Sequence, residues 1–429
     1  FIARPMASVP QACADRAATK AVYRFWDSPR VSPEAIFAAH QDATIERLRG
    51  ERFLFLIQDT TDLDFTTHDQ TVGLGPLDNS HVQGLKMHSA LVLNANGVPL
   101  GLLYQKVWAR DPAKRGQAKQ RRQRVTAEKE SQRWLDTLSA TEARLPADVE
   151  SITIADREAD IYDFLAMPRR ANSQLLIRAT HDRRVSNDGE YVWSTIRQSP
   201  EQGQFTVELR QQDGRPLRQA NLTVRFCTLT LLPPRHHSAR SSLQPIQVQA
   251  ILAEEENAQV DQPISWLLLT TLPVDSFTQA RQCIAWYSQR WLIERYHYVL
   301  KSGCQVEKLQ LEEADRLKRA FATYCIVAWR LLWITYHSRE QPEASCEVVF
   351  QPHEWQSLYA TIKKTLDMPP EPPTLRQTVH WIAQLGGFQG RKGDGEPGVK
   401  TIWLGLRRLY DIANSWLLFR PPSSGPTYG

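Results

Sequence analysis

The stretch SITIADREADIYDFL, residues 151–165, decides the fold class of this chain. Its first part, SITIA, has the apolar and β-branched residues of a short buried strand, and a helical pattern begins at Asp156. Two earlier segments, RFLFLIQDTTDLDF at 52–65 and HSALVLNANGVPLGLLYQKVW at 88–108, are rich in β-forming residues. The second contains Asn96-Gly97 between two apolar runs, which is a strong hairpin signal. A meander of three strands followed by a strand that enters a helix predicts a mixed α/β layer fold.

Segments on either side of this stretch complete the expected organisation. Helices are expected within residues 17–48 and in EKESQRWLDTL at 128–138. Between about residues 174 and 271, turn residues separate β-rich runs that we interpret as one inserted β subdomain: QLLIRAT, QFTVELR, LTVRFCTLTLL, PIQVQAIL and ISWLLLTT. From Phe277 onward the pattern is helical, with a Pro-rich linker at 367–374 and a Gly-rich one at 386–398.

The overall charge does not by itself indicate a nucleic-acid partner, because 52 Lys and Arg residues face 47 Asp and Glu residues for a formal net charge of +5. No apolar run approaches the ~18 residues that a membrane span requires, and the longest, at 326–334, contains Arg330. The N-terminal residues lack the continuous apolar run of a secretory signal. The six cysteines are scattered without a Cys-x-x-Cys pair, so we expect free thiols in a reducing cytoplasm.

Two carboxylates, Asp59 and Asp156, lie where β-rich runs end or pass into polar sequence. On neighbouring strands they could share divalent metal ions, because Mg²⁺ takes one or two carboxylates and leaves its other positions to water and phosphate. Each could also cap a turn or the helix that follows. For either residue alone the capping interpretation is favoured, so a metal site needs support from further residues.

The segment FTQARQCIAWYSQRWLIERYHYVLKSG, residues 277–303, gives that support. As one helix it places four polar side chains on a narrow face: Tyr287, Arg290, Glu294 and Lys301. We expect the opposite side to pack on the sheet: Ala285, Leu292, Tyr296 and Val299. A phenol, a guanidinium, a carboxylate and an ammonium suit a metal-bound phosphodiester. From the helix alone, a solvated face with ion pairs such as Arg290 with Glu294 is an equally good interpretation.

These motifs resemble those of bacterial DDE transposases of the insertion-sequence-four family, a group of Tn-five transposase-like enzymes. QDTT at 58–61 is similar to the family's motif around its first Asp, and ADREAD at 155–160 is similar to the second. The spacing of the four polar residues on the helix matches the family's Y-(2)-R-(3)-E-(6)-K signature. Shorter likenesses, among them EKESQRW at 128–134 and WLLLTT at 266–271, extend over essentially the whole chain.

The resemblance implies an RNase H-like catalytic core, which is a mixed five-stranded sheet with helices, and a β insertion between the second Asp and the Glu. It divides the chain into four regions. These are a partial N-terminal helical DNA-binding region at 1–48, a catalytic core at 49–170 and 273–310, an inserted β subdomain at 171–272, and a C-terminal helical dimerisation region at 311–429.

The resemblance also implies that Asp59, Asp156 and Glu294 hold two Mg²⁺ ions, for which Mn²⁺ can substitute. One ion would activate a water or a 3′-hydroxyl, and the other would stabilise the leaving oxygen during in-line attack on phosphorus. The family moves DNA by cut and paste: it nicks the transposon end, forms and opens a hairpin, and joins the end to target DNA. We expect nearby acids outside the ligand positions to cap helices or support the site: Asp62, Asp64, Glu158 and Asp160.

Several residues match positions that meet DNA in the family. Trp266 corresponds to the tryptophan that stacks on a flipped base, although a Trp before three leucines is more often part of a core. Arg157 and Arg178 match basic positions near the DNA, although either could be an ion-pair partner. The signature supplies three further groups that would bind phosphate oxygens: Tyr287, Arg290 and Lys301.

A basic run at residues 106–124 is the chain's concentrated block of positive charge. Polybasic segments commonly bind the phosphate backbone without reading sequence, and a solvated loop is the alternative. We expect a contact with target or flanking DNA, which the resemblance does not supply. The residues are Lys114, Arg115, Arg121, Arg122 and Arg124, together with Lys106, Arg110 and Lys119.

Partners and termini follow from the resemblance as well. We expect double-stranded DNA, as transposon ends and target, and a homodimer in a synaptic complex, with no membrane, in the bacterial cytoplasm at the nucleoid. The family's chains begin with a further helical segment, of which only the latter part is present here. A shortened chain that binds DNA or poisons dimers, and an RNase H-like nuclease without strand transfer, are therefore alternatives.

Overall fold

β1 (Phe53–Asp64) belongs to one large mixed sheet, in which it lies between β3 and β5. β3 (Gln83–Asn94) pairs antiparallel with β1, and β4 (Pro99–Trp108) pairs antiparallel with β3, which confirms the meander. Gly97, with a φ of +80°, allows the tight turn between them. β5 (Glu150–Ala155) and β6 (Ser173–Arg178) follow on the other side of β1, each parallel to its neighbour. The computed structural model describes residues 1–13, 15–79, 81–114, 124–186, 190–209, 218–237, 240–256 and 263–419.

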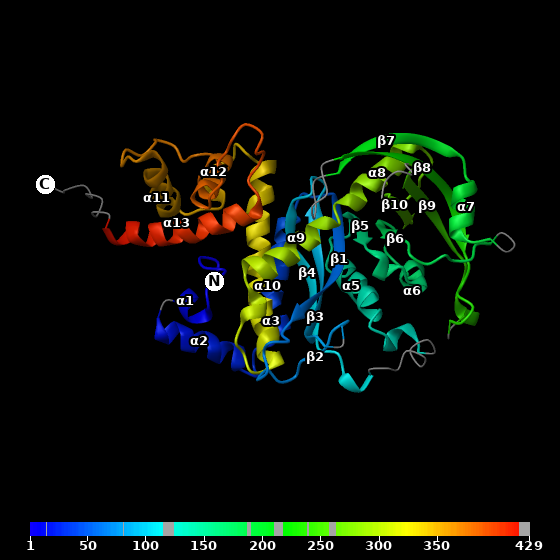
Figure 1. Ribbon diagram of the computed structural model, residues 1–429, viewed down its shortest axis with the longest axis horizontal. Coiled ribbons are helices and arrows are strands. Elements are labelled where there is room, and N and C mark those ends of the chain that lie inside the picture. The colour runs from blue at the N-terminus through cyan, green and yellow to red at the C-terminus, as the bar shows by residue number, and fades with distance from the viewer. Residues whose placement is uncertain are drawn as a thin grey trace.

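The strands predicted between residues 174 and 271 extend the same sheet and do not form a separate one (Figure 1). β10 (Ser265–Thr270) pairs antiparallel with β6, and β9 (Ile246–Glu255), β8 (Arg218–Leu231) and β7 (Glu201–Leu209) follow outward. α7 (Val192–Gln198) packs on β8 and β9. The boundary expected at residue 171 therefore falls between β5 and β6, which are hydrogen-bonded parallel neighbours.

Helices cover both faces of the central strands, and the alternation of side chains along each strand shows which face they meet. Phe55 and Ile57 of β1 are buried in one cluster with α9 (Trp291–Tyr298) and α10 (Ala314–Glu340). Ile154 of β5 joins that cluster, while its neighbour Ala155 packs on the other face with α5 (Gln132–Glu142) and α6 (Tyr162–Ala166). The three layers confirm the mixed α/β prediction.

Helices from both ends of the chain lie beside α10 (Figure 1). From the N-terminal end, α2 (Arg16–Asp27) and α3 (Pro33–Arg47) contact α10, and α1 (Val9–Cys13) packs on α2. From the C-terminal end, α12 (Leu375–Leu385) and α13 (Val399–Phe419) contact α10, and α11 (Pro352–Lys363) packs on both of them. α12 begins after the Pro-rich linker because Thr374 and Gln377 form a capping box. Arg4 and Asp411 join the two ends by an ion pair of 2.7 Å.

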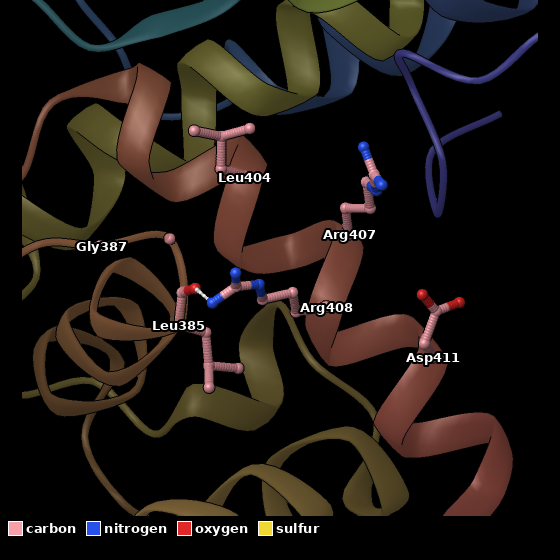
Figure 2. Close-up of a pocket in the computed structure, with 7 residues that line it drawn as sticks. Leu385, Gly387, Leu404, Arg407, Arg408 and Asp411 are labelled. Atoms are coloured by element: carbon pink, nitrogen blue, oxygen red, sulfur yellow. Dashed lines mark hydrogen bonds between the residues drawn. The ribbon is translucent and has the colours of Figure 1, made fainter.

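A cavity of about 300 Å³ lies between α12 and α13, with Asp411 in its wall (Figure 2). Arg408 crosses it and donates a hydrogen bond of 2.6 Å to the carbonyl of Leu385. The cavity is thus part of the packing of the two C-terminal helices.

Two predictions about the chain as a whole can be compared with the structure. All six cysteines are free thiols, as expected, and four of them are buried. Among the described residues, no helix is long and apolar enough to cross a membrane.

Candidate active site

Asp59 and Asp156 extend from neighbouring parallel strands toward the same face of the sheet. The last paired residues of β1 and β5 are Ile57 and Ile154, and both face α9 and α10. Each Asp follows its Ile by two residues, so the alternation of side chains directs both carboxylates to that face. The structure therefore brings together the first two carboxylates expected from the sequence.

The surroundings of Asp59 disfavour its negative charge. Its side chain is 15% exposed, and burial, followed by repulsion from Asp156, raises the pKa of this carboxyl to about 7. His297 on α9 faces it, with 3.7 Å between Nδ1 of His297 and Oδ2 of Asp59. Burial lowers the pKa of His297 to about 3, so the ring is neutral at pH 7 and does not compensate the carboxylate.

The raised pKa predicts how the stability of the metal-free protein depends on pH. Because the folded chain holds the Asp59 proton above the ordinary pKa of 3.8, the folded state loses stability as pH rises from about 4 to 7. Asp59→Asn removes this loss. The difference in free energy of unfolding between the variant and the wild type should therefore shift by about 2 to 3 kcal/mol in favour of the variant as pH rises from 5 to 8. Urea unfolding in EDTA measures the difference, and a difference that does not change with pH would contradict the raised pKa.

Asp156 also has the capping role that was its alternative interpretation. Its Oδ1 accepts a hydrogen bond of 2.9 Å from the backbone N–H of Glu158, at the start of the short helix η3 (Arg157–Ala159). The side chain is half-buried. Capping fixes the carboxylate in place beside Asp59 without enclosing it.

The segment at 277–303 is not the single helix that its spacing suggested. α8 (Phe277–Ser288) ends before Gln289, α9 follows, and a π-helical turn, η5 (Val299–Gly303), ends the segment. The amides of Gln289 and Arg290 donate to carbonyls three residues back, at 3.0 Å each, which tightens the chain and interrupts the helix. As a result Tyr287 is buried, with 4% exposure, and Ala285 is exposed, contrary to our expectation. The other three apolar residues are buried as expected: Leu292, Tyr296 and Val299.

Arg290 and Glu294 form an ion pair one helical turn apart, which was the alternative interpretation of this face. Both charges act on the carboxyl of Asp59: Arg290 lowers its pKa, and Glu294 raises it. The Glu294 side chain is 54% exposed. Within the described parts of the chain, no three Asp, Glu, His or Cys side chains are gathered closely enough to hold a metal ion. A site made of all three carboxylates would require Glu294 to leave Arg290 and turn toward the two aspartates.

Basic and aromatic side chains from β6 and β10 border the carboxylates. Burial lowers the pKa of Arg178, at the end of β6, and the nearby charges of Arg157 and Arg290 lower it further. Trp266 on β10 is half-buried and packs edge to face on Tyr287, with 5.8 Å between ring centroids. Three guanidiniums and the phenol of Tyr287 thus lie within electrostatic reach of the acidic groups, and Trp266 packs on that phenol ring.

Three family models match successive parts of the chain. One described as transposase DNA-binding matches residues 1–31, and one described as transposase Tn5 dimerisation domain matches residues 326–416. Between them, the transposase DDE domain matches residues 116–330, just over half of the 429 residues. This chain is a DDE transposase of the Tn5-like family.

Membership of this transposase family establishes the general activity and the core. The enzyme is a DNA transposase, a polynucleotidyl transferase and endonuclease with an RNase H-like core, and such enzymes use divalent metal ions. Strands β4, β3, β1, β5 and β6, in that order, form the mixed five-stranded part of the sheet. The terminal matches indicate DNA and a second copy of the transposase as partners.

The donor atoms of the site suit the ions that DDE transposases use. Asp59, Asp156 and Glu294 offer only carboxylate oxygens, which Mg²⁺ and Mn²⁺ prefer over softer ligands. The repulsion between carboxylates that raises the pKa of Asp59 is the interaction that a divalent cation would relieve. The residues present therefore fit a divalent metal site, once Glu294 turns toward the aspartates.

Lys301 of the transposase pairs with an acid outside the expected ligand set. It is in η5, and its Nζ is 3.5 Å from Oε1 of Glu307. Burial is the larger cause of the lowered pKa of His297, and the positive charge of Lys301 is the second cause. His297 in turn contacts Asp59. Lys301 thus influences the site through His297.

The acids outside the expected ligand positions all have other partners. Asp62 pairs with Lys86 at 2.6 Å, and Asp64 accepts from the amide of Thr66 at 2.9 Å. Glu158 pairs with Arg133, and the fully buried Asp160 pairs with Arg183 at 2.6 Å. These four acids cap turns or bind basic side chains.

Part of the basic run lies outside the described residues: Arg115, Lys119, Arg121 and Arg122. Lys106 pairs with Asp136 at 3.7 Å, and Arg110 pairs with Glu130 at 2.7 Å and Asp78 at 2.6 Å. Lys114 ends the short helix η1 (Pro112–Lys114), and Arg124 is half-buried. The charges of Lys106 and Arg110 are therefore already neutralised within the transposase.

Three side chains near the site were not expected from the sequence. His297 contacts Asp59, and Trp291, with 42% exposure, directly follows Arg290. Arg133 contacts Thr60, the residue after Asp59, and Glu158, two residues after Asp156. Helical spacing could have indicated His297, because it lies three residues after Glu294. Arg133 has no such signal, since its partners are distant in sequence.

Proposed function

We propose that this transposase moves DNA by cut and paste, using one site to nick the transposon end, form and open a hairpin, and join the end to target DNA. The observation that carries the proposal is the placement of Asp59 beside Asp156 and within electrostatic reach of Glu294, with the guanidiniums of Arg290 and Arg178 nearby. Phosphoryl transfer needs negative groups that hold metal ions next to positive groups that hold phosphate.

We assign Asp59, Asp156 and Glu294 as the ligands of two Mg²⁺ ions, with Mn²⁺ as a substitute. Such a pair, when bound, stabilises the attacking and leaving oxygens of an in-line displacement at phosphorus. The residues of the chain prepare this state. The Asp59 carboxyl gives up its proton near pH 7, and Glu294 exchanges Arg290 for the aspartates. Arg290 is then free to bind a phosphate oxygen.

Trp266 would stack on a base that has left the duplex, as the resemblance implies. Tyr287 packs on the Trp266 ring from one side. Because Trp266 is only half-buried, it keeps accessible surface for a base. Stacking of this kind contributes about 1–3 kcal/mol per base. Following the resemblance, we assign the phosphate contacts to Arg290, Lys301, Arg157 and Arg178, and to Lys114, Arg115, Arg121, Arg122 and Arg124 of the basic run. Tyr287 is buried against Trp266, so a phosphate contact of its hydroxyl would require this packing to open.

For the domains, we propose that β6 belongs to the catalytic core and that the insertion begins after it. The pairing of β6 with β5 on one side and β10 on the other supports this division. The N-terminal region would bind transposon ends, and the C-terminal helices would pair two transposases in a synaptic complex, in line with the two terminal matches.

Incubating the purified transposase with Mg²⁺ and a duplex of the inverted repeat that flanks its gene tests the proposal. Cut and paste predicts nicked ends, hairpins and joined molecules in that order, resolved on denaturing gels. Nicked ends alone would support an RNase H-like nuclease. Binding without cleavage would support a chain that only binds DNA or poisons dimers, which the intact set of carboxylates does not favour.

Trp266→Ala should separate hairpin formation from the first nick. Nicking should stay within about threefold of the wild type, while hairpin formation falls about 5- to 100-fold through the lost stacking. Single-turnover assays on denaturing gels measure both steps, and Trp266→Phe, which keeps an aromatic ring, should retain most hairpin formation. An equal loss of both steps would show that Trp266 acts structurally, through Tyr287.

A further inference from the structure

We propose that Arg133, on α5, is a positioning residue that fixes the spacing of Asp59 and Asp156. The inference rests on the proposed function, in which these two carboxylates share metal ions. The pairing of β1 with β5 ends at Ile57 and Ile154, before it reaches either aspartate. Both aspartates lie two residues beyond the end of that ladder.

Arg133 connects β1 with the segment that follows β5, just past the point where these two strands stop pairing. Its Nε donates a hydrogen bond of 2.9 Å to Oγ1 of Thr60, the residue after Asp59. Its NH2 group forms an ion pair with Glu158, whose backbone N–H binds Oδ1 of Asp156 at 2.9 Å. One guanidinium therefore connects Thr60, which follows Asp59, with Glu158, which binds the Asp156 carboxylate.

The guanidinium is itself held in place. It is 11% exposed, lies over the rings of Trp108 and Trp134 at 5.9 and 5.4 Å, and donates through NH1 to the carbonyl of Glu130 at 2.9 Å. Its planar set of donors fixes directions that a lysine ammonium does not. Arg133 can therefore transmit the rigid position of α5 to both strand ends.

Thr60 is fixed from its other side by a buried histidine. Because its hydroxyl accepts from Arg133, it can donate to Nδ1 of His88, 2.8 Å away, while Nε2 of His88 lies 3.4 Å from Oε1 of Gln58. Burial holds the pKa of His88 well below its usual value, so the ring is neutral and Nδ1 can accept. The residues on both sides of Asp59 are thus tied to one network.

Metal binding tests the bridge without relying on catalysis. For Arg133→Met we expect the affinity for Mn²⁺ to fall about tenfold or more, measured by the EPR signal of free Mn²⁺, because groups that orient ligands typically contribute 10- to 100-fold. The half-saturating Mg²⁺ concentration for nicking should rise in parallel. Arg133→Lys keeps the charge but not the two-sided bridge, so its affinity should stay well below that of the wild type.

Two further variants keep the result interpretable. Arg169→Met removes another half-buried arginine that binds only carbonyls near the end of α6, and it should lower the melting temperature without changing Mn²⁺ affinity. Glu158→Ala alters an exposed side chain and should fold, with Mn²⁺ affinity reduced about threefold or more.

The outcomes separate this inference from the proposed function. Wild-type Mn²⁺ affinity in folded Arg133→Met or in Glu158→Ala, or full recovery in Arg133→Lys, would overturn the bridge, provided that Asp59→Asn has lost Mn²⁺ binding. Undiminished Mn²⁺ binding in Asp59→Asn would instead overturn the metal site itself.

Discussion

Glu294→Ala should abolish nicking, hairpin formation and joining together, with each rate reduced at least about 1000-fold, while binding to transposon-end DNA persists. Loss of one carboxylate ligand weakens the stabilisation of charge at phosphorus, and about 4 kcal/mol of lost stabilisation corresponds to that factor. Stability should change little, because Glu294 is 54% exposed and its ion pair with Arg290 is close to solvent.

The measurement combines gel assays of the three products with a DNA-binding assay at the same ionic strength, since DNA affinity depends strongly on salt. Glu312→Ala is the matched control, because Glu312 is an exposed glutamate shortly after the site. Product formation by Glu294→Ala within about tenfold of the wild type would remove Glu294 from the proposed ligand set.

Asp160→Ala should destabilise the transposase by about 3–5 kcal/mol, the usual cost of removing one partner from a buried ion pair. The Asp160 side chain is fully buried and accepts hydrogen bonds from the amides of Thr180 and His181, at 2.8 and 2.7 Å, and from Nε of Arg183 at 3.0 Å. Its loss leaves a buried guanidinium and two amides without their acceptor. The same contacts hold the chain just after Arg178.

Urea unfolding of Asp160→Ala measures this loss. Asp42→Ala is the control, because the Asp42 side chain is 77% exposed in its pair with Arg144 and should contribute less than about 1 kcal/mol. Comparable stabilities for the two variants would mean that the buried pair is not a principal support of the ADREAD segment.

The strands of the site could be predicted because their evidence is local. The signals for β1, for β5 and for the turn at Asn96-Gly97 each come from residues that are close together in sequence. The structure contains each of these elements. The continuation of the sheet through β10 was not predictable in this way. Which strand pairs with β6 depends on contacts between residues nearly a hundred positions apart.

The helix of the signature shows where local reasoning fails. Uniform helical spacing assumes an unbroken helix, but the helix is interrupted at Gln289 and Arg290, and within α8 Tyr287 is buried while Ala285 is exposed. The resemblance found the signature residues regardless, because it compares spacing along the chain and needs no geometry. The Arg290–Glu294 pair was foreseen only as an alternative, and the sequence alone could not weigh it against a metal site.

The hydrogen-bonded path from β1 through β5 and β6 to β10 also limits how the enzyme can move. Domains joined by linkers swing relative to one another by default, but Trp266 and the aspartates stand on one uninterrupted sheet. If one site carries out the successive reactions proposed above, the protein's own changes would be local, such as the turn of Glu294 away from Arg290, and the larger displacements between steps would fall to the DNA.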